Sequence, residues 1–482
     1  MAKLIGPLQP YKPTSEKHFD SVKAAHLLNR AGFGGTEDEV KRVLELGPYE
    51  AVEWLLDFPD AGAEELSQDD VPDLSSVEGY PKNYREAQQL MRGMTEQERM
   101  AYRQKLMRVN REAVLATVAW WVQRMADGPH PLQEKLTLFW HGHFTTSARD
   151  ERSAHLLWQQ NELLRRQAAG NFAQFVLNIS RDPAMLDYLN NQQNRKQKPN
   201  ENYARELMEL FTLGIGNYTE KDIKEAARAF TGWGHNGDDF VFRKYDHDNG
   251  EKQFFGRRGN LDGHHVIEAI LDHRACAPYI AGRLWNFFVY EYPEPEVTQG
   301  LGQVLREAKW ELRPLLRTML TSQAFYSDKA IGTQIKSPVQ LVVGTSRLLG
   351  LELPVGRGLG NALAKMGQVP LEPPNVKGWP GGRAWINTST LFVRYNTAVR
   401  MVDGDNLTGR RTARSGVEIS LNGMSGKPAY EIVDAWVARL VQRPIESEKR
   451  RILVEAVGEK PTDESVKKMV QLIVSTPDYQ LC

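Results

Sequence analysis

The stretch NENYARELMELF (residues 200–211) shows the pattern that decides the fold class of this chain. Tyr203, Leu207 and Leu210 are spaced by three or four positions, so they share one face of a helix with 3.6 residues per turn. The opposite face is polar, as in an amphipathic surface helix. Segments with the same spacing, separated by Pro or Gly, continue through both halves of the chain. The sequence therefore predicts a mainly α protein built as a large multi-helix globular domain.

One segment departs from the helical spacing and favours β structure. Residues 240–245 and 252–255 flank the stretch DHDNG (246–250), whose Asn-Gly pair is typical of a hairpin turn. We therefore expect a small inserted β-hairpin near residues 240–256.

The domain organisation follows from a polar segment near the C-terminus. Residues 404–427 lack apolar periodicity and are rich in Gly, Ser and Arg, so they are predicted to form a linker or surface loop. This places a main helical domain with the inserted hairpin at 1–403. The remaining residues, 428–482, are predicted to form a C-terminal helical segment that packs on the main domain.

Composition argues against several classes of partner and structure. Of the 482 residues, 61 are Lys or Arg and 61 are Asp or Glu, so no net charge attracts nucleic acid or an acidic membrane surface. No apolar run approaches the roughly 20 residues of a membrane span, and residues 1–17 lack the apolar run of a signal peptide, which predicts a cytoplasmic protein. The two cysteines, Cys276 and Cys482, are too few for a disulfide framework or a thiolate-rich metal site.

Two carboxylates in the opening stretch are candidates for chemistry. Glu206 and Glu209 are neighbours at i and i+3 on the polar face, where such a pair can ligate a metal ion or share a proton. The alternative is a solvated face on which Arg205 pairs with Glu209 or with a neighbouring helix.

A pair of histidines lies in the stretch FWHGHF (139–144). His141 and His143 are one residue apart, so in an extended backbone both imidazoles point to the same side and can bind a metal ion. The alternative is a pair of histidines at a helix end, satisfied by backbone carbonyls. His247 and Asp248, in the predicted hairpin turn, can add an imidazole and a hard oxygen ligand, although turns are rich in Asp for conformational reasons alone.

The loop PPNVKGWPGGRAWIN (373–387) is too long and irregular to serve only as a break between helices. Arg383 lies between Trp379 and Trp385, where it can hold a carboxylate, sulfate or phosphate, or assist a sugar ring stacked on an indole. The alternative is a loop anchored in the core by its two tryptophans. Its composition predicts that it packs over the same cavity as His141 and Glu206.

Six blocks of the sequence together resemble the signature of a bacterial family known as domain of unknown function 1800. The blocks are residues 26–34, 139–144, 200–214, 226–233, 247–252 and 378–387. The resemblance itself implies no particular activity. Members of the family are often secreted and are often encoded beside a second family that resembles sulfatases and alkaline phosphatases. The resemblance also implies that residues of the six blocks converge in space.

The leading functional hypothesis is a metal-assisted hydrolase that acts on an anionic substrate and holds a divalent metal ion. Its predicted metal ligands are His141, His143, His247 and Asp248; its catalytic residues are Glu206, Glu209 and Arg383; its substrate-binding residues are Trp379, Trp385, Asn387 and Arg205. The alternative is a non-catalytic binding or assembly partner of the sulfatase- or phosphatase-like protein. A third hypothesis, a glycan-binding or glycan-cleaving protein, rests on the two tryptophans and the paired carboxylates.

Overall fold

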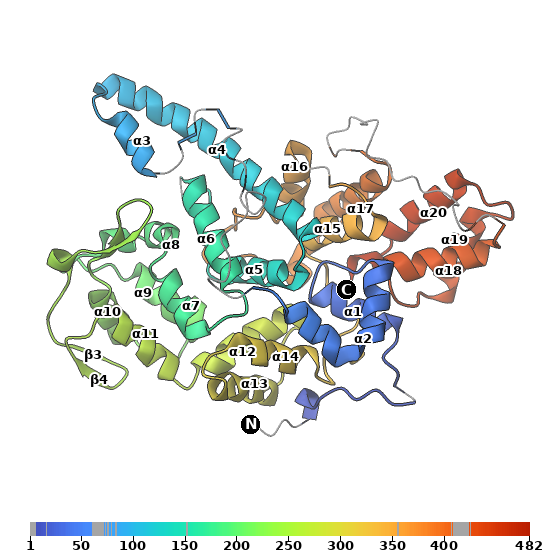
Figure 1. Cartoon of the computed structure of the whole chain (residues 1–482), viewed down its shortest axis with the longest axis horizontal. Helices are drawn as coiled ribbons and strands as arrows, with labels where there is room; N and C mark the ends of the chain where they lie inside the picture. The colour runs from blue at the N-terminus through green and yellow to red at the C-terminus, as the bar shows by residue number, and fades with distance from the viewer. Residues whose placement is uncertain are drawn as a thin grey trace.

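The computed structural model describes the chain except for residues 1–5, 16, 60–71, 73, 75–76, 79, 82–83, 151–152, 354–355, 406, 408–423 and 425. The described part is mainly α, as the sequence predicts, with two small antiparallel two-strand sheets (Figure 1). Most of the predicted linker at 404–427 lies outside the described residues. Within the described ranges, no helix combines the length and apolar character needed to cross a membrane.

The helices of the first half are α1 (Ser21–Arg30), α2 (Glu37–Leu56), α3 (Tyr84–Met91), α4 (Glu96–Asp127), α5 (Pro131–His143), α6 (Ala154–Arg166), α7 (Phe172–Ile179), α8 (Pro183–Tyr188), α9 (Asn202–Glu206) and α10 (Glu220–Ala229). Those of the second half are α11 (Gly263–Asp272), α12 (Cys276–Phe288), α13 (Pro295–Glu307), α14 (Leu312–Leu320), α15 (Pro338–Leu349), α16 (Arg357–Met366), α17 (Thr388–Val402), α18 (Ala429–Leu440), α19 (Ser447–Val457) and α20 (Asp463–Val474).

Local signals explain where the first long helices break. The spacing of apolar residues predicts one helix over 83–126, but the structure divides this range into α3 and α4. Gly93, with a φ of 90°, ends the first piece. Thr95 then begins α4 with a capping box, in which its side chain accepts the backbone N–H of Glu98 and Glu98 returns a bond to the backbone of Thr95.

The β segment forms two hairpins rather than the one predicted. β1 (Trp233–His235) pairs with β2 (Phe240–Phe242), and β3 (Lys252–Phe254) pairs with β4 (Arg257–Gly259). The predicted pairing of 240–245 with 252–255 is therefore wrong. β3 pairs with β4 because a tight turn follows β3. In this turn Phe255 and Gly256 have φ angles of 42° and 79°, which reverse the direction of the chain.

Two hydrophobic clusters form the interior of the described part. One is built mainly from α1, α2, α7 and the helices from α9 to α14, and the other mainly from α4 and the helices from α15 to α20. α5 contributes to both, with Leu136 in the first cluster and Leu138 in the second. Figure 1 shows α5 accordingly in the middle of the molecule, where it positions the candidate site residues.

The C-terminal helices share the second cluster with the rest of the chain. α18 contacts α15 and α20 contacts α17. Trp436 of α18 and Met469 of α20 are buried in that cluster. The last residues return further inward, since Cys482 exchanges backbone hydrogen bonds with Gln334.

Candidate functional site

Glu206 ends α9 at the point where the helix widens into a π-helical turn, η5 (Leu207–Thr212). The predicted apolar face of this segment is buried, with Tyr203 and Leu207 at most 1% exposed. The wide turn is stabilised by the hydroxyl of Thr212, which donates to the carbonyl of Leu207 at 2.5 Å. Because π-helical turns are frequent at functional sites, the polar face beside this turn is a candidate functional site.

A cleft of about 850 Å³ lies in front of Glu206. Its walls come from α3 and α4, the start of α6, the end of α8 with the residues after it, α9, and the loop at 374–376. The polar side chains of the wall are Tyr80, Asn110, Asp150, Ser153, His155, Asp187, Tyr188, Asn190, Asn202, Glu206 and Asn375. The apolar part includes Met91, Leu106, Leu156 and Val376. The mixture of carboxylates, amides and apolar surface is typical of a site for a small polar ligand.

Glu206 is the carboxylate in the cleft whose environment suits proton transfer. Burial and the negative charge of Glu209 raise the pKa of the Glu206 carboxyl, while Lys377 and Arg205 offset part of this rise. Burial also raises the pKa of Tyr188, and so do the charges of Asp150 and Glu206. A carboxyl that keeps its proton nearer to neutral pH can act as a general acid.

Asp187 lies close to a buried histidine. Nε2 of His235 lies 3.0 Å from Oδ1 of Asp187. Nδ1 of His235 accepts the backbone N–H of Gly237 at 3.1 Å, so the ring proton belongs on Nε2, facing the carboxylate. The imidazole is 5% exposed and the carboxylate 40%, so the ring lies beneath Asp187 on the protein side while Asp187 reaches the cleft; the buried Nε2 makes no hydrogen bond to the carboxylate.

The loop at 373–387 lies against the end of α5, and its residues 374–376 line the cleft together with Glu206, whereas His141 is not part of that wall. The carbonyl of Pro373 accepts the hydroxyl of Ser147 at 3.2 Å, and the ring of Trp379 lies 5.5 Å from that of His141. At Gly378, with a φ of +75°, a Cβ atom would come within 2.2 Å of the Gly142 carbonyl oxygen, so this close approach requires glycine.

The two histidines of α5 are buried and point to different surroundings. Both lie in the last helical turn rather than in extended backbone, so the predicted common orientation is wrong. Nε2 of His141 accepts the backbone N–H of Leu371 at 3.1 Å, and Nε2 of His143 donates to the carbonyl of Phe211 at 2.9 Å. Burial lowers the pKa of each imidazole to about 3. Both rings are therefore neutral, and each makes one hydrogen bond to the backbone, while the buried Nδ1 of His143 has no partner among the described residues.

The other two predicted metal ligands are engaged near α10. Nδ1 of His247 donates to the carbonyl of Thr231 at 2.8 Å, and Asp248 accepts Nε of Arg228 at 2.7 Å. No group of three or more His, Cys, Asp or Glu side chains placed to hold a metal ion occurs among the residues that the structure describes. The structure thus does not bring His141, His143, His247 and Asp248 together as one ligand set.

Glu209 and Arg205 are not part of the cleft wall, and both form hydrogen bonds with other side chains. Glu209 accepts the hydroxyl of Tyr218 at 2.8 Å. Arg205 donates to both oxygens of Glu220 on α10, at 2.8 and 2.9 Å, and to Glu201 at 3.3 Å. Arg205 therefore bridges to a neighbouring helix, one of the two partners expected for it.

We expect Arg205→Met to lower the midpoint of thermal unfolding slightly and to leave ligand binding in the cleft unchanged. The reason is that its guanidinium joins α9 to α10 and is not part of the cleft wall. Calorimetry and ligand titration of the variant check both statements. Unchanged stability together with lost binding would instead assign Arg205 to the ligand.

The far end of the loop has a structural part and an exposed part. Trp385 is 6% exposed, whereas Arg383 and Asn387 are exposed. The side chain of Asn387 caps α17 by accepting the backbone N–H of Thr390 at 2.9 Å. Trp379, Trp385 and Arg383 are not part of the cleft wall. The structure therefore does not place these predicted residues in the same cleft as Glu206.

Asp150, His155, Asp187 and Tyr188 are cleft residues that the sequence analysis did not find. They lie at the start of α6 and the end of α8, a helix too short for its spacing to stand out. The signal available was the stretch NN (190–191), whose first residue has a φ of 59° that asparagine tolerates. Such a turn indicates that the chain changes direction, but it does not predict which carboxylates then lie close together.

These features define a mainly α protein with a polar, carboxylate-lined cleft at a π-helical turn. The chain belongs to the family described as "Protein of unknown function (DUF1800)", which matches residues 26–481. No curated protein and no solved structure matches the chain. The match confirms the resemblance carried by the six sequence blocks.

Proposed function

We propose that this protein is a hydrolase that acts on a small, neutral polar substrate in the cleft by general acid–base catalysis. Glu206 protonates the leaving group, and Asp187 accepts the proton of the attacking water. The single observation that carries the proposal is the half-buried Glu206 carboxyl, whose pKa is raised by burial and by Glu209, at the wall of a cleft of about 850 Å³.

The charges of the cleft wall support a neutral substrate. Asp150 and Asp187 contribute two carboxylates, and burial lowers the pKa of the nearby His155, which keeps that imidazole neutral. An anionic group would meet like charge on these walls. The amides of Asn190 and Asn202 offer donors and acceptors that fit hydroxyl or amide groups.

This proposal differs from the hypothesis of a metal-assisted hydrolase for an anionic substrate both in the role of a metal ion and in the charge of the substrate. His141 and His143 are buried and hydrogen-bonded to the backbone, and so they fit a metal ion poorly. Arg383, the expected anion holder, is exposed and does not line the cleft. The proposal therefore keeps hydrolysis, with the attacking water activated by Asp187 instead of a metal ion and the leaving group protonated by Glu206.

A sulfatase- or phosphatase-like partner protein remains a second proposal. It rests on the family resemblance alone, and no contact within the described residues favours it over the first.

The proposal is tested with a panel of alkyl substrates, whose leaving groups depart only when they are protonated, that compares neutral glycosides, esters and amides with the phosphate and sulfate esters. We expect turnover of a neutral member and a fall in kcat/KM of about 10²–10⁴-fold in Glu206→Gln, because proton donation to the leaving group is lost. Full activity in Glu206→Gln, or turnover confined to the phosphate or sulfate ester, would contradict the assignment.

Glu209→Gln provides the matched variant on the same helix. Because the charge of Glu209 raises the pKa of Glu206, its removal lowers that pKa. Activity that needs protonated Glu206 should then decline at lower pH, so the alkaline limb of the pH–rate profile moves toward acid while turnover persists. An alkaline limb that does not move would show that Glu206 is not the titrating acid.

A further inference from the structure

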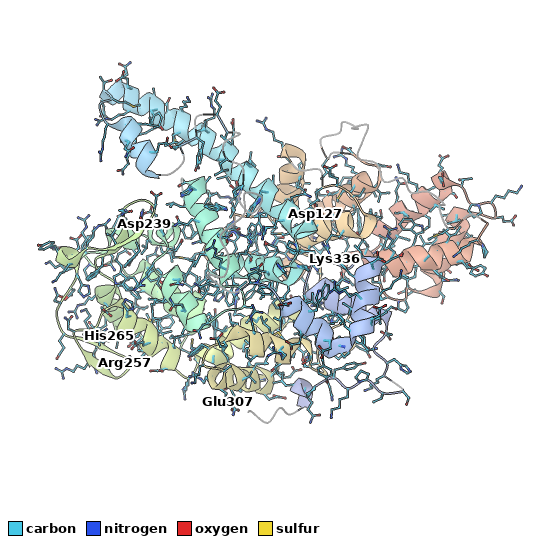
Figure 2. The ribbon with its side chains drawn as sticks, viewed as in Figure 1. Asp127, Asp239, Arg257, His265, Glu307 and Lys336 are labelled. Atoms are coloured by element: carbon cyan, nitrogen blue, oxygen red, sulfur yellow. The ribbon has the colours of Figure 1, made fainter. Side chains whose placement is uncertain are left out.

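Four basic side chains are buried in the interior in two neighbouring pairs: Arg30 and Lys135 both contact the end of α12, and Arg394 donates to the carbonyl of Lys336. Arg30 ends α1, Lys135 lies in α5, Lys336 precedes α15, and Arg394 lies in α17. Their exposed fractions are 1%, 4%, 4% and 0%. Figure 2 shows Lys336 near the middle of the molecule, and Figure 1 marks the C-terminus in the same region.

The two arginines of this cationic cluster are bonded to neutral acceptors and keep unused donors. Arg30 donates through Nη2 to the carbonyl of Ala330 at 2.5 Å, and its buried Nε has no hydrogen-bond partner. Arg394 donates through Nε to Oε1 of Gln480 at 2.8 Å and through Nη2 to the carbonyl of Lys336 at 2.7 Å. Its buried Nη1 has no partner. Neither guanidinium has a carboxylate partner among the described residues.

The two lysines meet aromatic faces rather than hydrogen-bond acceptors. Nζ of Lys135 lies 5.0 Å from the ring centroid of Phe33 and 5.5 Å from that of Phe287. Nζ of Lys336 lies 4.1 Å from the ring centroid of Tyr479. Cation–π contacts recover only part of the hydration that an ammonium loses on burial.

The charges of the cationic cluster are poorly balanced. The negative charge that acts on Arg30, Lys135 and Lys336 within the described part of the chain is that of Cys482, the last residue of the sequence. Burial, together with repulsion from Arg30 and Lys336, lowers the pKa of Lys135 to about 7. Burial, together with repulsion from Arg443 and Arg394, lowers the pKa of Lys336 to about 8. One negative charge thus faces several buried cations, an arrangement that costs folding free energy.

Two other buried cations of the chain are fully paired and stabilise the fold. Arg165, 2% exposed, is paired with Glu134 and Glu162 at 2.7 and 2.8 Å. Lys252, 1% exposed, donates to the carbonyls of Asp248 and Gly250 and to Asn260. The cationic cluster differs from these two residues because it lacks such partners in the part of the chain that the structure describes. Buried cations without partners indicate a ligand-binding site.

We propose that Arg30, Lys135, Lys336 and Arg394 form a buried receptor for a doubly charged tetrahedral oxyanion, the phosphate or sulfate group of a small ligand. Two guanidiniums with unused N–H groups and two ammoniums can surround such an anion from several sides. A doubly charged group matches the excess of positive charge, which a neutral ligand would leave uncompensated. None of the four residues lines the cleft, so the receptor is a site separate from the one that contains Glu206.

The test measures thermal unfolding in inorganic phosphate and in sulfate, with ionic strength held constant by chloride. We expect either oxyanion to raise Tm of the wild type above its value in chloride, because a ligand that binds only the folded state stabilises it. The anion with the larger shift identifies the preferred group. Equilibrium dialysis with the labelled anion should find one bound per chain.

Two lysine variants distinguish this site from general salt effects. Lys135→Met removes a buried charge that has no hydrogen bond, so it should keep or raise Tm in chloride and lose the oxyanion shift. Lys252→Met is the matched control: it breaks three hydrogen bonds and should lower Tm in chloride while the oxyanion shift persists. Lys336→Met provides a second variant if Lys135→Met does not fold.

Two results would overturn the proposal. One is an oxyanion shift of the same size in the wild type, Lys135→Met and Lys336→Met, which would assign the effect to the surface. The other is a wild-type protein that neither phosphate nor sulfate stabilises beyond chloride and that retains no labelled anion.

Discussion

Replacement of Glu134 by alanine is expected to destabilise the protein by about 3–5 kcal/mol, because it leaves buried positive charge without its partner. Glu134 is 2% exposed and accepts four hydrogen bonds. Oε1 accepts Nε of Arg124 and Nε of Arg165, each at 2.7 Å, and Oε2 accepts Nε1 of Trp121 at 2.9 Å and Nη2 of Arg165 at 3.1 Å. The carboxylate therefore joins α4, α5 and α6, which meet where the two hydrophobic clusters adjoin.

Denaturant unfolding of Glu134→Ala measures this loss, and Glu53→Ala is its control. Glu53 also accepts two bonds from one arginine, Arg317, but both partners of that pair are nearly half exposed. Water screens and replaces such a pair, so its loss should cost about 1 kcal/mol or less. Equal losses in the two variants would show that burial of the Glu134 network contributes nothing beyond a surface pair.

The same network predicts a pH dependence. Despite the opposing effect of burial, Arg165 and Arg124 lower the pKa of Glu134. A carboxyl whose pKa is lower in the folded than in the unfolded protein stabilises the fold above the unfolded value, about 4.3, and loses that contribution as pH falls. The difference in unfolding free energy between wild type and Glu134→Ala should therefore shrink on acidification.

Helices with long apolar spacing could be predicted from the sequence with near-correct ends. The apolar spacing predicts helices at 263–272 and 388–402, and both ranges coincide with the observed helices α11 and α17. The hairpin region was less predictable, since the Asn-Gly pair at 249–250 offered a favourable turn. In the structure the hairpin turn follows β3 instead. The Asn-Gly stretch is joined to α10 by the hydrogen bond that Arg228 donates to Asp248. Local turn chemistry alone could not decide between these turns.

The histidine pair shows why candidate site residues are harder to predict than helices. The spacing of His141 and His143 fits a metal site only in extended backbone. In the structure, aromatic packing continues α5 to His143, which stacks on Phe139 at 5.8 Å, while Trp140 stacks on Phe144 at 5.6 Å. These i,i+4 contacts were present in the sequence as a helical signal.

The adjacent residues Glu134 and Lys135 show a second limit of sequence reasoning. Both are charged, both are buried, and they are neighbours in the chain. One is satisfied by Arg124, Arg165 and Trp121, and the other faces Phe33 and Phe287. The difference depends on which helices pack on each side of α5, so only the tertiary structure separates a structural charge from a candidate ligand group.

Replacement of Trp385 by alanine is expected to destabilise the protein by about 3 kcal/mol, the lower part of the range for a buried tryptophan. The indole is 6% exposed and lies against the end of α16, where it would be 4.0 Å from a Cβ at Gly367. The hydroxyl of Thr390 donates to the Trp385 carbonyl at 2.9 Å, which fixes the same residue to the start of α17. Trp385 therefore anchors the loop between two helices of the second cluster.

Loss of this anchor should also loosen the cleft, because residues 374–376 of the same loop form part of its wall. Unfolding by denaturant measures the stability, and limited proteolysis of the loop measures the local effect. Arg383→Ala is the control within the loop: its side chain is exposed, so stability and proteolysis should stay close to wild type. A Trp385→Ala protein that loses less than about 1 kcal/mol would contradict the anchoring role, since deletion of a buried indole leaves a cavity that the surrounding helices rarely fill.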